Sequence, residues 1–152
     1  KKIEPAFVSG LLHGIGKVVL DRFFKKEFGA AVAHAEANDI TSFEAEREII
    51  GLSAAQVGSV LLEKWKLNPE LVGAVEHQEN PVRGGEFSKE AAHVLTGTVL
   101  ARVLRLGSSG DHHLPHLTKE ILDLCKIESP QWPRLLELTV DEAKRASVFH
   151  EM

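Results

Sequence analysis

The stretch TSFEAEREIIGLSAAQVGSVLLEKWKLNP, residues 41–69, contains start signals for three consecutive helices. Thr41 and Glu44 have the T-x-x-E spacing of a capping box, in which each side chain satisfies a backbone N–H at the helix start. Ser53 is a favourable N-cap residue for the apolar-periodic segment that follows it. Asn68 precedes a proline, which is favoured in the first helical turn because it has no N–H to satisfy. The stretch therefore predicts short helices joined by short turns.

The rest of the chain continues this helical pattern. Apolar residues recur at helical spacing, whereas Asn-Gly or Asp-Gly hairpin signals and any sustained two-residue alternation are missing. The predicted fold class is all-α, a bundle of about eight helices. The first helix is apolar on most sides, so we expect it to be central and buried, with Gly14 and Gly16 bending or breaking it. The expected helices cover residues 5–20, 23–39, 41–50, 53–67, 69–81, 88–106, 118–125 and 130–149.

The composition is that of one ordinary globular domain. With 152 residues, 43% hydrophobic and 26% charged, the chain can form a single sizeable core. Its formal net charge is -4, whereas proteins that bind nucleic acids broadly carry an excess of basic residues, so we expect no nucleic-acid partner. The single cysteine, Cys125, permits no internal disulfide, and no apolar run approaches the ~20 residues that span a bilayer. No signal peptide is visible, and we expect a cytoplasmic protein without membrane contact.

Two segments contain histidines that could face a shared cleft. In LLHGIGKVVL, residues 11–20, His13 and Lys17 are four apart, so a continuous helix would carry both on one face. They could combine a metal ligand with a phosphate-binding ammonium, or be a hydrogen-bonded core histidine beside a lysine that extends to solvent. For these two residues alone, the second interpretation is the better one. In VEHQENP, His77 and Gln78 could face the same cleft or simply be solvated near a helix end.

A second group of histidines lies in the loop GDHHLPH, with Asp111, His112, His113 and His116 close together. Three imidazoles and a carboxylate could bind a transition metal, but no partner groups that would orient the ligating rings are evident. We therefore favour an exposed loop that binds metal only adventitiously. Cys125 lies between apolar residues, and we expect a buried, inert thiol.

Four segments share their order, spacing and flanking residues with a known family, over nearly the whole chain. They are FVSGLLHGIGKVVL (7–20), IGLSAAQVGSVLLEKWKL (50–67), AVEHQENP (74–81) and AAHVLTGTVLARVLRLGSSGD (91–111). Together they resemble the HDOD domain, a bacterial signalling module related to the HD superfamily of metal-dependent phosphohydrolases. The resemblance implies an HD-domain-like helical bundle.

The resemblance also implies where an active HD enzyme would hold metal. Such enzymes have an adjacent His-Asp pair, a histidine at the start of a later helix, a His-His pair and an aspartate in the long helix, with one further ligand upstream of Lys1. The corresponding positions here are His13, Gly14, Ala54, His77, Gln78 and Thr96. Only the two histidines keep a ligating side chain, whereas catalytic Zn²⁺ needs about three protein ligands. We therefore expect a degenerate site with no catalytic residue, no metal and no cofactor.

Three functions remain open from the sequence. The leading interpretation is a non-catalytic signal-transduction or regulatory domain acting through protein–protein contacts, such as the output part of a response regulator. The alternative is an HD-superfamily phosphohydrolase or phosphodiesterase acting on a nucleotide, with a rearranged site of His13, His77, His93 and Glu76. The third is a pocket without chemistry, in which His13, Lys17 and His77 bind an anionic nucleotide.

The family has an additional N-terminal helical half that is not recognisable in this sequence. The resemblance therefore implies that residues 1–152 form a single domain from the C-terminal part of a longer protein. An apolar face of the first helix would then be left for a fused signalling domain, another protein partner or a second copy of the chain in a homodimer.

Overall fold

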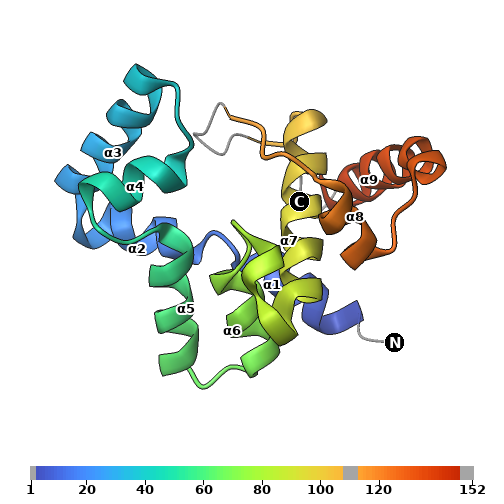
Figure 1. The fold of residues 1–152 in the computed structure, drawn as a ribbon, viewed down its shortest axis with the longest axis horizontal. Helices are drawn as coiled ribbons and strands as arrows, with labels where there is room; N and C mark the ends of the chain where they lie inside the picture. Colours follow the sequence, from blue (N-terminus) through green and yellow to red (C-terminus); the bar gives the residue numbers. More distant parts are fainter. Residues whose placement is uncertain (1–2, 108–112, 148–152) are drawn as a thin grey trace.

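The computed structural model describes residues 3–107 and 113–147, and every regular element in these ranges is helical (Figure 1). The predicted all-α class is therefore confirmed. The α-helices are α1 (Ile3–Leu12), α2 (Ile15–Phe23), α3 (Lys25–Asn38), α4 (Ser42–Ile49), α5 (Ala54–Lys64), α6 (Pro69–Glu76), α7 (Ser88–Val103), α8 (Lys119–Cys125) and α9 (Trp132–Ser147). Three short 3-10 turns join them, η1 (Pro81–Arg83), η2 (Gly85–Phe87) and η3 (Ser129–Gln131).

The capping residues begin their helices as the sequence predicts. Thr41 Oγ1 accepts from the N–H of Glu44 at 3.3 Å, and the Glu44 carboxylate accepts from the N–H of Thr41 at 3.0 Å. Ser53 forms the same reciprocal pair with Gln56 at the start of α5. Asn68 Oδ1 accepts from the N–H of Glu70 at 2.8 Å. These side chains satisfy N–H groups that have no partner within the helix.

The first predicted helix is divided in two, so the described residues form nine α-helices rather than about eight. α1 ends at Leu12 and α2 begins at Ile15, with Gly14 as its N-cap. Two residues later Gly16 lies against α5, where a Cβ atom would come within 1.8 Å of the Ala54 carbonyl oxygen. Glycine is therefore required for the close approach of α2 to α5.

The remaining differences concern helix ends. α6 ends at Glu76 rather than near Pro81, and α7 ends at Val103 rather than near Leu106. The expected loop over residues 81–88 contains the turns η1 and η2. Residues 108–112 of the second expected loop lie outside the described ranges.

α7 lies between the two ends of the molecule, with α3 and α4 on one side and α8 and α9 on the other (Figure 1). The most extensive helix packing is that of α2 on α5, α3 on α4, α5 on α6 and α6 on α7. One core cluster contains Leu62, Val72 and Val75, with Leu12, Ile15 and Leu67 packed against it. A second contains Ala92, Leu95 and Ile121, with Leu117, Leu124 and Cys125. No described helix is both long and apolar enough to cross a membrane.

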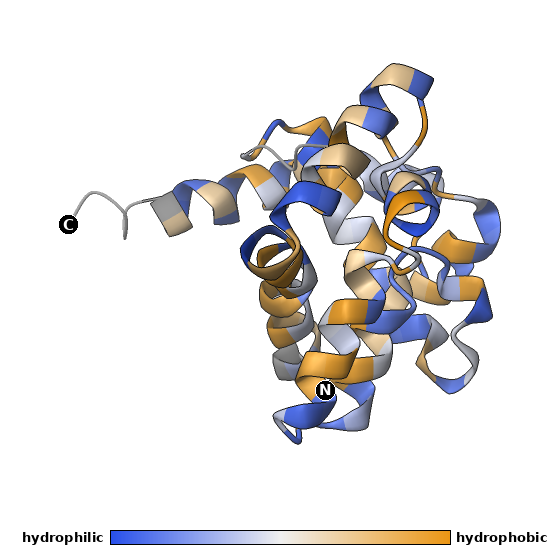
Figure 2. Cartoon of the chain, turned by 90° about the vertical axis from the view of Figure 1, so that its left-hand side faces the viewer, coloured by the Kyte–Doolittle hydropathy of each residue, from blue (hydrophilic) through white to orange (hydrophobic). Residues whose placement is uncertain are grey.

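The expectation that the first helix is buried is wrong for much of its length. Phe7 and Leu11 on α1 are 70% and 72% exposed, and Val18 on α2 is 62% exposed. Only the opposite side of α2 is covered, where Gly16 and Leu20 are buried. In Figure 2 the ribbon beside the N label is coloured mainly as apolar. The apolar residues that the sequence places on most sides of one helix belong to two short helices, each with one side packed against the domain and one side exposed to solvent.

Candidate functional site

A cleft of about 670 Å³ lies between α1, α2, the start of α5 and one side of α7. The break between α1 and α2 places His13 and Gly14 on one wall, and α7 supplies His93, Gly97 and Arg102 on another. The volume is in the range of small-molecule pockets. Six of the residues singled out in the sequence line it: His13, Gly14, Lys17, Ala54, Gln78 and His93.

Of the positions implied by the HD resemblance, His13, Gly14, Ala54 and Gln78 line the cleft. Thr96 and His77 are not among its described lining residues. The Thr96 hydroxyl is buried 3.5 Å from Cys125 Sγ, whereas the next residues on α7, Gly97 and Thr98, face the cleft. His77 Nε2 is 3.8 Å from a carboxylate oxygen of Glu76.

Gln78 connects the end of α6 to the break between α1 and α2. Its side chain is 6% exposed, and its Nε2 donates to the carbonyl oxygens of His13 at 3.0 Å and Val75 at 2.9 Å. Both carbonyls lie near helix ends, where such groups have no helical partner. A side chain that donates to two backbone carbonyls holds the chain together at this point.

The two imidazoles that line the cleft are each tied to their own helix. His13 Nδ1 is 2.6 Å from the Gly10 carbonyl oxygen, and His93 Nδ1 is 2.7 Å from that of Lys89. A carbonyl oxygen only accepts, so Nδ1 donates and the neutral ring has its lone pair on Nε2. This bond fixes the tautomer and holds each ring against its helix.

The proposed rearranged metal site does not assemble in residues 3–107 and 113–147. These ranges hold no group of three or more His, Cys, Asp or Glu side chains that could bind a metal ion. His13 and His93 line the cleft, but His77 and Glu76 are not part of its described lining. The two histidines that line the cleft are fewer than the protein ligands of a catalytic zinc site, which number about three.

The histidine-rich loop is only partly described, because Asp111 and His112 lie outside the described residues. His113 Nε2 is 3.0 Å from a carboxylate oxygen of Asp39, and His116 is exposed. Cys125 is half-buried, and burial raises the pKa of its thiol. A higher pKa disfavours the reactive thiolate, in keeping with the expected inert thiol.

Positive charge lines the cleft at two further residues, Lys17 on α2 and Arg102 on α7. Arg102 Nη1 donates to the carbonyl oxygen of His113 at 2.6 Å. No Asp or Glu occurs among the lining residues within the described ranges. Of the anion-binding residues suggested by the sequence, His13 and Lys17 therefore line the cleft and His77 does not.

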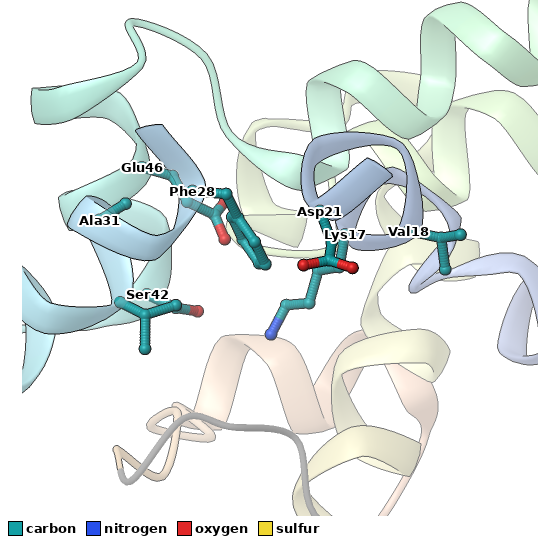
Figure 3. Close-up of a pocket in the computed structure, with 8 residues that line it drawn as sticks. Lys17, Val18, Asp21, Phe28, Ala31, Ser42 and Glu46 are labelled. Atoms are coloured by element: carbon teal, nitrogen blue, oxygen red, sulfur yellow. The ribbon is translucent and has the colours of Figure 1, made fainter. Parts of the chain in front are cut away.

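Lys17 also borders a smaller cavity of about 350 Å³ between α2, α3 and α4. Figure 3 shows its side chain beside Asp21 on α2, with Phe28, Ser42 and Glu46 on the facing helices. Lys17 thus lies at the border of two cavities of different character, since the smaller one has two carboxylates in its lining.

A group of buried acids beside the cleft was not recognised from the sequence. Glu46 is 1% exposed and accepts from the N–H of Ala54 at 2.6 Å, at the start of α5. The Glu79 carboxylate is 6% exposed and bonds to Arg47 at 2.5 Å. Burial raises the pKa of Glu79, opposed in part by Ser53, Arg47 and Ala55. The residues come from three separate segments, so only the tertiary fold brings them together.

Arg102 and Gly97 were also missed as lining residues. The available signal was a glycine in the middle of a long predicted helix, where glycine costs about 1 kcal/mol relative to alanine. Such a glycine calls for a reason in packing or in function.

The fold and the cleft define an all-helical domain of the HD-like type. A structure from Shewanella amazonensis SB2B described as an inferred phosphohydrolase is 24% identical, with a TM-score of 0.68 over 91% of this chain. An HDOD domain protein of unknown function from Geobacter sulfurreducens is 26% identical, with a TM-score of 0.66 over 94%. In each case the match covers 50% of the other chain, so this chain spans about half the length of these structures.

The HDOD domain family model matches residues 1–81, and the chain belongs to this family. No curated protein gives a match. The resemblance seen in the sequence is thereby confirmed.

Proposed function

We propose that this domain is a non-catalytic regulatory module that transmits signals through protein–protein contacts, for example as the output part of a response regulator. The observation that carries the proposal is the role of Gln78, at a position where HD enzymes hold a histidine. Its amide is engaged by two backbone carbonyls. The adjacent positions Gly14 and Ala54 have no ligating side-chain atom at all. These features favour a packing role for Gln78 in place of metal binding.

The exposed apolar residues of α1 and α2 support a role in protein contacts. Phe7, Leu11, Val18 and Phe23 are all more than half exposed. Contiguous apolar surface on a folded domain commonly marks an interaction site. We further propose that the module is bacterial and cytoplasmic and works within a longer protein, in keeping with the two matched chains of which it spans half.

Metal analysis together with a hydrolysis assay tests this proposal. The purified protein should retain no stoichiometric Mn, Fe or Zn after dialysis, and should release no phosphate or nucleotide from cyclic and linear nucleotides. A metal activates water by lowering its pKa towards 7, so hydrolysis without a bound metal is not expected. One tightly bound metal ion per chain with metal-dependent turnover would refute the proposal.

The alternative is a metal-dependent phosphohydrolase, favoured by the shared position of His13 and His93 on one cleft. If turnover is found, replacing both histidines with alanine should abolish it, while His34→Ala on α3 should not. His34 is a suitable control because it interacts with Glu48 outside the cleft. Activity that survives the double replacement would rule out this site.

A further inference from the structure

The break between α2 and α3 forms an exposed corner at one end of the molecule, made of residues 22–26. α2 ends at Phe23 and α3 begins at Lys25, so that Phe24 alone separates the two helices. Every residue from 21 to 27 is exposed, and both helices lie at the left-hand end of the ribbon in Figure 1. Phe23 and Phe24 are 73% and 48% exposed. The corner therefore presents two adjacent aromatic side chains to water, where apolar surface is unfavourable.

The corner departs from the local rules of helix stability. Phe24 is the N-cap of α3 and forms no side-chain capping hydrogen bond, whereas α4, α5 and α6 each begin with a capping side chain. Lys25 and Lys26 occupy the first turn of α3, where the helix dipole disfavours positive charge. Only Glu27 in that turn has the favourable sign. Departures from several local rules at one place are expected where a sequence serves function.

Three cationic side chains surround the two phenylalanines. Arg22 precedes them, Lys25 and Lys26 follow them, and these five consecutive residues contain no acid, although the chain has a net charge of -4. The acids Asp21 and Glu27 lie on either side, and Asp21 lines the smaller cavity (Figure 3). Within residues 3–107 and 113–147, no ion pair involves the three cationic side chains. Their positive charge can therefore act on a partner.

We propose that the corner of residues 22–26 binds the anionic surface of a phospholipid bilayer. Aromatic rings enter the boundary between headgroups and acyl chains, while long basic side chains reach anionic headgroups from above it. The corner lines neither of the two cavities described above, so it is a projecting feature and not a groove. A protein partner would need an acidic pocket shaped around the two rings, whereas a fluid bilayer adapts to a projecting corner.

This contact differs from the membrane contact that the sequence argues against. We expected no membrane partner because no apolar run is long enough to span a bilayer, but a peripheral contact requires no such run. Phe23 is also one of the exposed apolar residues that support protein contacts, and the adjacent cations distinguish it from Phe7 and Leu11 on α1. The inference does not depend on the regulatory role proposed above, because lipid binding requires neither the lack of a metal nor a protein partner.

Sedimentation with lipid vesicles tests the inference on the 152-residue chain. The protein should bind vesicles of phosphatidylcholine with roughly 30% phosphatidylglycerol at least about tenfold more tightly than vesicles of phosphatidylcholine alone, because only the first carry a negative surface charge. High salt should weaken this binding, since it screens exposed charges. Equal binding to both kinds of vesicle, or no binding to the anionic vesicles, would overturn the proposal, and the second result would favour an acidic protein surface as the partner.

A first pair of variants tests the aromatic side chains. Phe23→Ser combined with Phe24→Ser should weaken binding to the anionic vesicles at least about tenfold, because serine has no apolar surface to insert. The control combines Val60→Ser and Trp65→Ser near the end of α5, where the side chains are 52% and 53% exposed. It should bind as the wild type does. Equal losses in the two variants would show that the vesicles detect general hydrophobicity, which contradicts the assignment to the corner.

A second pair of variants tests the charges and keeps the proposal falsifiable if the phenylalanine variant does not fold. Lys25→Gln combined with Lys26→Gln should weaken binding to the anionic vesicles at least about tenfold. Lys64→Gln combined with Lys66→Gln is the control, because it removes two exposed lysines near the end of α5 and gives the same net charge. It should bind as the wild type does. Unchanged binding after replacement of Lys25 and Lys26, or equal losses in both variants, would overturn the proposal.

Discussion

At the scale of single residues, Gln78 is the clearest example of a site position with a structural role. Removing its side chain in Gln78→Ala leaves two carbonyl groups without their buried donor. Unsatisfied buried groups of this kind cost roughly 1 to 3 kcal/mol, so we expect a loss of that order in the free energy of unfolding. Urea denaturation followed by circular dichroism measures it.

Gln78→Glu is the matched variant, because it keeps the shape of the side chain but can no longer donate when ionised. It should be at least as destabilising as alanine at neutral pH. If both variants unfold at the same urea concentration as the wild type, Gln78 does not hold α6 to the break between α1 and α2.

Glu79 gives a prediction about pH. Burial raises the pKa of its carboxyl above the ordinary value of 4.5, so the folded state binds its proton more tightly than the unfolded state. This stabilising contribution is fully present below pH 4.5 and is lost as the pH rises through the folded-state pKa. Glu79→Gln removes the titration. The free energy of unfolding of the variant relative to that of the wild type should therefore increase as the pH rises from 4.5 through the folded-state pKa of Glu79.

Denaturation of both proteins at several pH values from 4 to 8 measures the difference directly. The ion pair between Arg47 and Glu79 stabilises the wild type at higher pH and is lost in Glu79→Gln. The readout is therefore how the difference in unfolding free energy between the two proteins changes with pH, and not the sign of that difference at one pH. A difference that stays constant, or falls with rising pH, would show that the carboxyl is not held in a destabilising environment.

At the scale of elements, the packing of α2 on α5 depends on a single glycine. In Gly16→Ala the new Cβ would lie 1.8 Å from the Ala54 carbonyl oxygen and 2.8 Å from the Gly58 nitrogen, both backbone atoms. The two helices would have to separate, and we expect a loss of roughly 3 kcal/mol or more in unfolding free energy. The Tm should fall accordingly.

Gly29→Ala on α3 is the control for helix propensity. An added Cβ there meets nothing within 4 Å, so the variant should gain up to about 1 kcal/mol. If the two variants have similar stability, the close approach of α2 and α5 does not limit stability.

The elements show which features a sequence can predict. The starts of α4, α5 and α6 depend on local chemistry, and Thr41, Ser53 and Asn68 all accept the backbone hydrogen bonds that the sequence predicts. The break between α1 and α2 was signalled by its glycines. The exposure of α1 was not predictable from the sequence. A helix with apolar residues on most sides has the same sequence pattern whether it is central and buried or packed on one side only.

At the scale of the whole molecule, the cleft depends on contacts that a linear pattern does not contain. The positions of His13 and Gln78 near one another follow from the resemblance to the HDOD family. The lining of the cleft comes from α1, α2, α5 and α7, and Arg47 pairs with the buried Glu79 carboxylate 32 positions further on, so no local spacing links these groups. Such groups become recognisable only when α4, α6 and α7 are placed in space.

The open apolar side of α1 and α2 leads to a prediction about association. Phe7 and Leu11 are one helical turn apart and both about 70% exposed, so they present one contiguous apolar surface to water. In the absence of another partner, we expect the 152-residue chain to self-associate through this surface as concentration rises. Sedimentation velocity should show an increasing mean sedimentation coefficient, and the double variant Phe7→Ser, Leu11→Ser should remain monomeric.

The control replaces two exposed apolar side chains elsewhere, Val60→Ser and Trp65→Ser near the end of α5, which are 52% and 53% exposed. It removes exposed apolar area without touching α1, so it should associate as the wild type does. If the control and the α1 variant are equally monomeric, association reflects general hydrophobicity and not a defined face. A wild-type chain that stays monomeric at all concentrations would show that α1 and α2 do not form a contact surface between copies of this chain.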